Sequence, residues 1–177
     1  MRVIAGRFGG RRLIAPRGTR TRPTSDRVRE ALFSVLGETV VDAGVLDLFA
    51  GSGALGIEAL SRGAAHATFV DSAPAAVRAI RSNLESLGID AEVQRSDARA
   101  ALRSARAAAR QYDLIFLDPP YRLAAPLADG LSEAIEVLLA PGGSVVCESD
   151  RRAPLDLDLA LRDQRHYGDT LIRIHGS

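Results

Sequence analysis

Residues 45–56 read VLDLFAGSGALG, an apolar run that passes directly into a glycine-rich turn. The first five of them have the length and composition of a buried strand, and the residues after the turn continue as a helix to about Arg62. Gly51, Gly53 and Gly56 have the spacing G-x-G-x-x-G, in which glycine lets the backbone turn tightly and approach a ligand. The stretch predicts a strand, a ligand-binding loop and a helix. A tight turn that binds nothing is the alternative.

The same order of strand, turn and helix repeats along the chain on both sides of this stretch. Strands are predicted over residues 45–49, 67–70, 91–94, 112–117 and 144–147, and helices over about 25–36, 54–62, 74–87, 98–110 and 126–138. Strands that alternate with helices are joined by right-handed crossovers, which produce a parallel sheet covered on both faces. The sequence therefore predicts an α/β fold with a Rossmann-like, doubly wound, mostly parallel sheet.

The two ends of the chain differ from this repeat. Residues 2–5 and 12–15 flank a glycine-bearing turn and predict a small β-hairpin. The alternating leucines of residues 155–159 and the apolar run 170–174 predict one or two antiparallel strands at the C-terminal edge of the sheet. We expect a basic N-terminal hairpin or arm over residues 1–23 and one larger domain over residues 24–177.

Composition sets limits on the class of protein. With 177 residues the chain fits one domain, and 46% hydrophobic and 25% charged residues are ordinary for a globular protein. No apolar run reaches the 18 residues that a membrane span needs, and the first residues do not resemble a signal peptide. Cys147 has no partner for a disulfide and is interpreted as a buried strand residue, and the three histidines lack metal-ligand spacing. We expect a cytoplasmic protein without a metal.

Positive charge is concentrated at the N-terminus. Residues 1–30 contain nine arginines and two acids, a net charge of +7 in a chain whose total is +1. A basic arm on a mildly acidic body indicates a polyanion partner. The candidate phosphate-binding residues are Arg7, Arg11, Arg12, Arg20, Arg22 and Arg27. The alternative is solubilising charge on a tail, and a solvated helix face is favoured for the arginines at 99, 103, 106 and 110.

Residues 112–121 read YDLIFLDPPY, an apolar strand that ends in an acid, two prolines and an aromatic residue. Proline lacks an N–H and fixes φ, so the strand must stop there. Asp118 and Tyr121 are thereby delivered to the carboxyl end of the strand, where open α/β sheets bind their ligands. A turn capped by an acid is the plain alternative.

Three acids surround the predicted glycine loop. Asp47 precedes it, Asp71 ends the second strand and Asp97 follows the third. Acids would repel the pyrophosphate of NAD, whereas the sulfonium, amino, ribose and adenine groups of S-adenosylmethionine can use carboxylates as acceptors. The pattern favours S-adenosylmethionine over NAD, and an NAD-dependent oxidoreductase stays the alternative from another class.

Residues 47–53, DLFAGSG, together with residues 118–121, DPPY, resemble the class I methyltransferases that modify exocyclic amino groups of bases. Residues 22–33, RPTSDRVREALF, resemble one branch, the bacterial small-subunit (16S) ribosomal RNA guanine-N2 methyltransferases. The likeness covers nearly the whole chain and is weakest past about residue 150. Because the second motif also occurs in DNA adenine methyltransferases, adenine-N6 methylation of DNA or RNA is the alternative within the class.

This resemblance implies S-adenosylmethionine as cofactor and ribosomal RNA as partner, within the small subunit or an assembly intermediate. The implied catalytic residues are Asp118, Pro119, Pro120 and Tyr121. The implied cofactor contacts are Thr24, Asp47, Phe49, Ala50, Gly51, Ser52, Gly53, Asp71, Ser72, Asp97 and Ala98. Thr24 and Arg27 are shared between cofactor and RNA in a way that the sequence leaves open. An RNA-binding module without activity is a further alternative.

Overall fold

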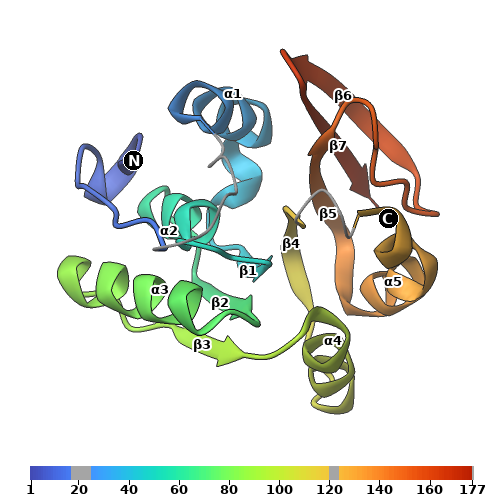
Figure 1. Cartoon of the computed structure of the whole chain (residues 1–177), viewed down its shortest axis with the longest axis horizontal. Coiled ribbons are helices and arrows are strands. Elements are labelled where there is room, and N and C mark those ends of the chain that lie inside the picture. Colours follow the sequence, from blue (N-terminus) through green and yellow to red (C-terminus); the bar gives the residue numbers. More distant parts are fainter. Residues whose placement is uncertain (17–24, 120–123, 177) are drawn as a thin grey trace.

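The computed structural model describes residues 1–16, 25–119 and 124–176, with residues 124–130 described by their backbone alone. One seven-stranded sheet runs through this part of the chain in the order β3-β2-β1-β4-β5-β7-β6 (Figure 1). The strands are β1 (Gly44–Leu48), β2 (His66–Asp71), β3 (Glu92–Arg95), β4 (Tyr112–Leu117), β5 (Leu139–Asp150), β6 (Leu161–Tyr167) and β7 (Thr170–Gly176). Neighbouring strands among β1–β5 are parallel, and β7 is antiparallel to both of its neighbours. The predicted doubly wound, mostly parallel sheet is confirmed.

Helices cover both faces of the sheet (Figure 1). They are α1 (Asp26–Leu36), α2 (Ala54–Ser61), α3 (Pro74–Leu87), α4 (Ala98–Ala107) and α5 (Ala124–Leu138), with short 3-10 turns at Gly6–Phe8 and Gly37–Val40. The alternation along β4 shows the two layers, since Phe116 joins the apolar cluster with α1–α3 and Leu117 joins the cluster with α4 and α5. Alternate strand residues thus form two separate cores, as a sheet buried on both sides requires.

Local signals fix several of the helix ends. Ser25 is the N-cap of α1, where its hydroxyl accepts the Val28 N–H at 3.3 Å. Asp97 caps α4 by accepting the Ala100 N–H at 2.9 Å, and Gly88 ends α3 at a φ of +65°. Side-chain caps and left-handed glycines satisfy backbone groups that a helix end leaves without partners.

The connections between strands create a switch point between β1 and β4. After β1 the chain continues to β2, which pairs with one side of β1. Strand β4 pairs with the other side of β1, and from there the chain continues outward to β5. Leu48 is in register with Val70 of β2 and with Leu117 of β4, so these strands end at the same edge of the sheet. Such a switch point opens a crevice at the carboxyl ends of the strands, where ligands bind.

The N-terminal segment, residues 1–16, differs from the predicted hairpin. Its two arms pair through a single antiparallel bridge between Arg2 and Arg12 in place of two strands, and a 3-10 turn over Gly6–Phe8 lies within the connection between them. Val3 and Leu13 are buried in the core cluster of α1–α3, so this segment packs on the body. The expected boundary at residue 23 lies outside the described residues.

The C-terminal half also corrects several boundaries. Helix α5 begins at Ala124, two residues before the predicted proline, and β5 begins at Leu139 and includes the two glycines expected to precede it. The leucines of residues 155–159 do not form a strand, because Leu155 and Leu157 pack into the core with α4 and α5. The tail forms two antiparallel strands, but β7 is inside the sheet and the polar β6 is the edge.

Candidate active site at the carboxyl ends of the strands

The glycine loop, residues 49–53, joins the end of β1 to α2. Phe49, Gly51 and Gly53 have φ values of +76°, +57° and +78°, a left-handed backbone that glycine adopts readily and an aromatic residue rarely. The N–H groups of Phe49 and Ala50 both donate to the Val70 carbonyl of β2, at 3.0 and 2.9 Å. These bonds hold the loop in a compact turn at the switch point.

The second glycine of the motif is required by its left-handed backbone, and the third by close packing. A Cβ atom on Gly56 would lie 2.4 Å from the ring of Phe69 on β2, too close for any other residue. A Cβ on Gly53 would lie 3.3 Å from the same ring and from Ile57. Helix α2 therefore lies closer to the sheet than a side chain at Gly56 would allow, and its N-terminus is drawn to the strand ends.

Asp47 lies beneath the loop. It is 2% exposed, and its carboxylate accepts the Gly56 N–H in the first turn of α2 at 3.0 Å. Burial raises the pKa of Asp47 from its ordinary 3.8 to about 7; the Gly56 N–H opposes this shift and the Asp71 charge adds to it. The bond to Gly56 connects β1 to α2, and the cofactor contact that the sequence predicts for Asp47 stays a prediction.

Asp71 connects the glycine loop to the end of β2. Its two carboxylate oxygens accept the Gly51 N–H at 2.9 Å and the Ala73 N–H at 2.8 Å, and the side chain is half-buried. A carboxylate has about four acceptor positions, so Asp71 keeps capacity for further donors. Ser72 beside it is exposed. This part of the site presents acceptors next to the loop.

Two more predicted acids follow β3 and β4. Asp97 is exposed at the N-cap of α4, and Ala98 behind it is buried. Asp118 comes directly after β4 and is half-buried, and the adjacent Pro119 is buried. The carboxyl ends of β2, β3 and β4 thus each carry an acid at the edge where the glycine loop lies. Pro120 and Tyr121 lie outside the described residues.

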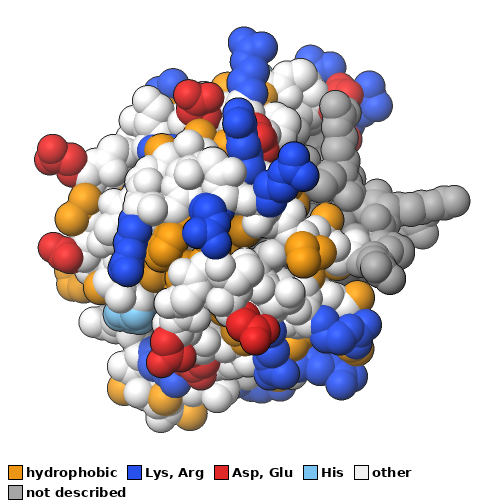
Figure 2. Space-filling model, turned by 90° about the vertical axis from the view of Figure 1, so that its left-hand side faces the viewer, with side chains coloured by type: hydrophobic (Ala, Val, Ile, Leu, Met, Phe, Trp, Pro, Cys, Tyr) orange, Lys and Arg blue, Asp and Glu red, His pale blue; other side chains and the backbone are white. Residues whose placement is uncertain are grey.

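The candidate RNA-binding arginines are exposed wherever the structure describes them. Arg7 lies over the ring of Phe8 at 5.1 Å, and Arg11 donates to the Ser86 carbonyl of α3 at 2.9 Å. Arg12 and Arg27 are exposed as well. Figure 2 shows arginine side chains spread over the face that carries the N-terminal segment and α3. Arg20, Arg22 and Thr24 lie outside the described residues.

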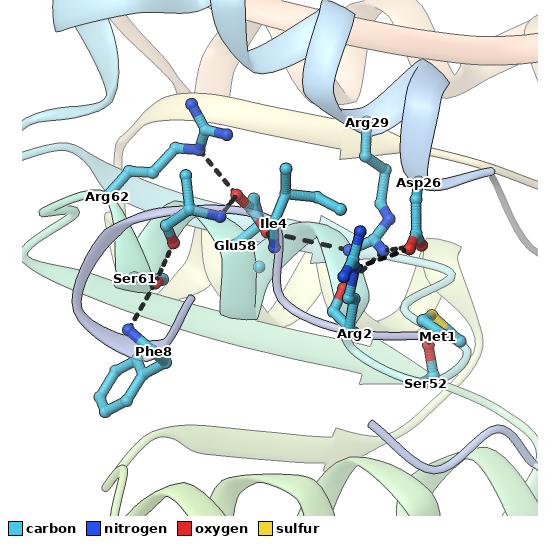
Figure 3. A network of polar contacts seen from close by, with 12 residues as sticks. Met1, Arg2, Ile4, Phe8, Asp26, Arg29, Ser52, Glu58, Ser61 and Arg62 are labelled. Carbon is cyan, nitrogen blue, oxygen red and sulfur yellow. Dashed lines mark hydrogen bonds and ion pairs between the residues drawn. The ribbon is translucent and has the colours of Figure 1, made fainter. Parts of the chain in front are cut away.

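Sequence reasoning missed a buried polar network that fastens the N-terminal segment to the body (Figure 3). Glu58 of α2 is fully buried; its carboxylate accepts the N–H groups of Ile4 and Ala5 at 2.7 and 3.0 Å and pairs with Arg62 at 2.7 Å. Arg29 of α1 is also fully buried and lies 3.9 Å from the Glu58 carboxylate. Arg29 is a charged residue within α1, and it is buried because the N-terminal segment lies against that face of the helix.

Arg29 completes this network toward the first turn of α1. One guanidinium nitrogen donates to the Arg2 carbonyl at 2.7 Å and to the Asp26 carboxylate at 2.8 Å. Asp26 also pairs with the Arg2 side chain at 3.3 Å. The basic segment, α1 and α2 are therefore held by one set of charge-assisted bonds, which are stronger than neutral ones.

Asn83 of α3 joins the N-terminal segment to the glycine loop. It is 1% exposed, and its amide nitrogen donates to the Ser52 carbonyl at 2.9 Å and to the Ile14 carbonyl at 3.0 Å. Its amide oxygen accepts the Ile14 N–H at 2.8 Å. Ser52 also donates to the Met1 sulfur at 3.4 Å. The segment that carries the candidate RNA contacts thus touches the candidate cofactor loop directly.

Among the residues that the structure describes, no helix is both long and apolar enough to cross a membrane. In the same part of the chain, no three His, Cys, Asp or Glu side chains gather as a metal ion would require.

The strand order, with antiparallel β7 between β5 and β6 and a glycine loop after β1, is that of a Rossmann-like class I methyltransferase. The chain belongs to the family described as "Conserved hypothetical protein 95", whose model matches residues 1–176.

Named relatives cover most of the chain. It is 43% identical over 183 aligned residues to "Putative rRNA methyltransferase YlbH" of Bacillus subtilis (strain 168). This alignment covers 99% of this chain and 98% of the relative. It is 44% identical over 123 residues to "Ribosomal RNA small subunit methyltransferase D" of Escherichia coli (strain K12). That alignment covers 69% of this chain and 61% of the relative. A solved structure, "Putative methyltransferase yhhF from Escherichia coli", superposes with a TM-score of 0.84 at 35% identity. The superposition covers 99% of this chain and 97% of that structure's chain.

Proposed function

We propose that this protein transfers a methyl group from S-adenosylmethionine to the exocyclic N2 of a guanine in small-subunit ribosomal RNA. The observation that carries the proposal is the position of Asp118 and Pro119 beside the glycine loop, at the switch point between β1 and β4. The names of the relatives, which include rRNA methyltransferases, support an RNA substrate.

The residues around the glycine loop fit S-adenosylmethionine. The loop brings bare backbone to the strand ends, and Asp71 and Asp97 add carboxylates there. Acceptors suit a cationic sulfonium with amino and ribose hydroxyl groups, whereas a pyrophosphate would be repelled. The proposed contacts are Thr24, Phe49, Ala50, Gly51, Ser52, Gly53, Asp71, Ser72, Asp97 and Ala98. Asp47, which also bonds to α2, is a further proposed contact.

The proposed chemistry needs two acceptors at one point. An exocyclic amine is a poor nucleophile because its lone pair is delocalised into the ring. If the Asp118 carboxylate and the Pro119 carbonyl accept its two N–H groups, the nitrogen becomes pyramidal and its lone pair points at the methyl group. S-adenosylmethionine bound at the loop would supply the electrophilic methyl group, and the Asp118 carboxylate, as acceptor of one N–H, would take the proton that the amine loses on methylation. Pro120 would fix the turn that holds both acceptors.

The target base must leave its stack to reach Asp118. Unstacking costs a few kcal/mol, and less for a nucleotide that is already unpaired. Stacking on Tyr121 would offset about 1–3 kcal/mol of this cost. We therefore infer an exposed guanine as target, in the small subunit or an assembly intermediate in the cytoplasm, with the basic segment as the RNA-binding arm.

Mapping methylated nucleosides tests the proposed function. Ribosomal RNA from cells that lack the gene should lose one N2-methylguanosine, and purified protein with S-adenosylmethionine should restore it on subunits from those cells. Mass spectrometry of nuclease fragments measures both results. Appearance of N6-methyladenosine instead would establish the alternative within the class, and NAD binding without S-adenosylhomocysteine binding in calorimetry would refute the methyltransferase proposal.

Removing two arginines of the N-terminal segment should weaken RNA binding. In the double variant Arg7→Ala, Arg12→Ala, we expect RNA affinity to fall about tenfold at low salt. The slope of log affinity against log salt concentration should also decrease in magnitude by about 1.5, because each lost phosphate contact reduces this slope by about 0.7–0.9. Filter binding at several salt concentrations measures both.

The matched control removes the same charge from α4. Arg103 and Arg106 are exposed there, away from the N-terminal segment, and their replacement by Ala should change the slope little. Equal effects of the two double variants would mean that the arm makes no specific contribution. Affinity for S-adenosylhomocysteine should stay unchanged in both.

A further inference from the structure

Glu148 of β5 is an acidic residue buried within the sheet. It is 5% exposed, and it lies two residues after Val146, which belongs to the core cluster of α1–α3. Its partner on β7 is Ile172, a buried residue of the same cluster. A buried carboxylate near the carboxyl ends of the strands, where such sheets bind ligands, is a candidate for a role at the site.

The register between β4 and β5 places Glu148 beside Asp118. Leu117 pairs with Cys147, so the next residues along the two parallel strands are Asp118 and Glu148. Neighbouring strands lie about 4.8 Å apart, which brings two such side chains within reach of one small ligand. Glu148 is thus the adjacent acid on the strand that follows the proposed catalytic turn.

Strand alternation gives the face on which both residues lie. Phe116 and Val146 are paired and contribute to the cluster of α1–α3, whereas Leu117 and Cys147 contribute to the cluster of α4 and α5. The following position on each strand returns to the side of α1. This is the side of the N-terminal segment, from which RNA would approach the strand ends.

Two adjacent carboxylates match guanine and not adenine. The edge of guanine that carries N2 presents the two N2–H donors next to the N1–H donor. The corresponding edge of adenine presents N6–H donors next to N1, which has a lone pair and no hydrogen. A second carboxylate would accept the guanine N1–H, and it would face the adenine lone pair with no donor between them.

We propose that Glu148 is a specificity-determining residue that accepts the N1–H of the target guanine while Asp118 holds its N2 amine. This inference rests on the proposed function and deepens it, because it states why guanine is chosen over adenine. A buried acceptor left without a donor is the device by which sites reject an analogue that lacks one group.

The base 2-aminopurine tests this role, since it keeps the N2 amine and lacks the N1 proton. Subunits are reconstituted with RNA that carries either guanine or 2-aminopurine at the nucleotide found to be methylated. For the wild-type protein we expect kcat/KM to be at least about 100-fold higher on guanine. Methylation of 2-aminopurine within about threefold of guanine would overturn the inference without any variant.

The variant Glu148→Gln reverses part of the preference. Its amide can donate to the unprotonated N1 of 2-aminopurine, so the ratio of the two kcat/KM values should fall by at least about tenfold. Glu136→Gln, the same change at an exposed position on α5, should leave the ratio unaltered. An unaltered ratio in Glu148→Gln, with guanine methylation and folding retained, would refute the role. Absence of N2-methylguanine with the wild-type protein would instead refute the proposed function.

Discussion

Replacing Asp118 by Ala should abolish methyl transfer and leave affinity for S-adenosylhomocysteine within about twofold of the wild-type value. The carboxylate is one of two acceptors proposed for the target amine, and it follows β4 rather than forming part of the glycine loop. Loss of a single positioned electrostatic contact typically lowers kcat by about 100- to 1000-fold, and misorientation of the amine adds to this. Single-turnover transfer of a radiolabelled methyl group measures the rate, and calorimetry measures the affinity.

Asp90 provides the matched control for this variant. It is an exposed acid before β3, and Asp90→Ala removes the same charge away from the strand ends. It should retain full activity. Activity of Asp118→Ala within tenfold of the wild-type protein would eliminate the proposed role of the carboxylate. Loss of cofactor affinity in parallel would reassign Asp118 to the cofactor.

The largest effect on stability is expected for Glu58→Ala. This change leaves the Arg29 cation buried with its nearest interior carboxylate removed, and it deprives the Ile4 and Ala5 N–H groups of their acceptor. Breaking a buried ion pair by removing one partner costs about 3–5 kcal/mol. The free energy of unfolding should fall by that amount, and the midpoint of thermal unfolding by on the order of 10 °C.

Hydrogen exchange separates this loss from a general weakening of the protein. The amides of Ile4 and Ala5 should lose protection, because they donate directly to Glu58. Glu58→Gln keeps an acceptor for them and should retain part of their protection. Glu85→Ala, on the exposed face of α3, should change stability by less than about 0.5 kcal/mol. A Glu58→Ala protein as stable as this control would show that the network contributes little.

Much of the fold could be predicted because its signals are local. The N-cap at Ser25, the glycine that ends α3 and the acids at the strand ends depend on a few neighbouring residues. The glycine loop could be located for the same reason, since its glycine spacing is local: Gly53 has a positive φ, and Gly56 lies against Phe69. The spacing of apolar residues, together with the capping and glycine residues at the ends of the elements, was sufficient to predict these elements.

The errors arose where distant segments determine the outcome. Arg29 is a charged residue within α1, and only the packing of the N-terminal segment against that face of the helix makes it a buried residue. Leu155 and Leu157 alternate like strand residues, yet α4 and α5 offer them a core to fill without a neighbouring strand. Nor could the sequence reveal that Asn83 spans two segments, because its partners lie 31 and 69 positions away.

The two outer strands of the sheet also affect how copies of the protein behave at high concentration. An edge strand offers unpaired N–H and C=O groups to any other extended chain, which is a common route to aggregation. Here β3 has only four residues and carries Glu92 and Arg95, and β6 carries Arg162, Asp163 and Arg165 along a largely exposed length. Charge repulsion and desolvation oppose strand addition at both margins. The position of β7 between β5 and β6 therefore keeps the apolar strands away from an open edge.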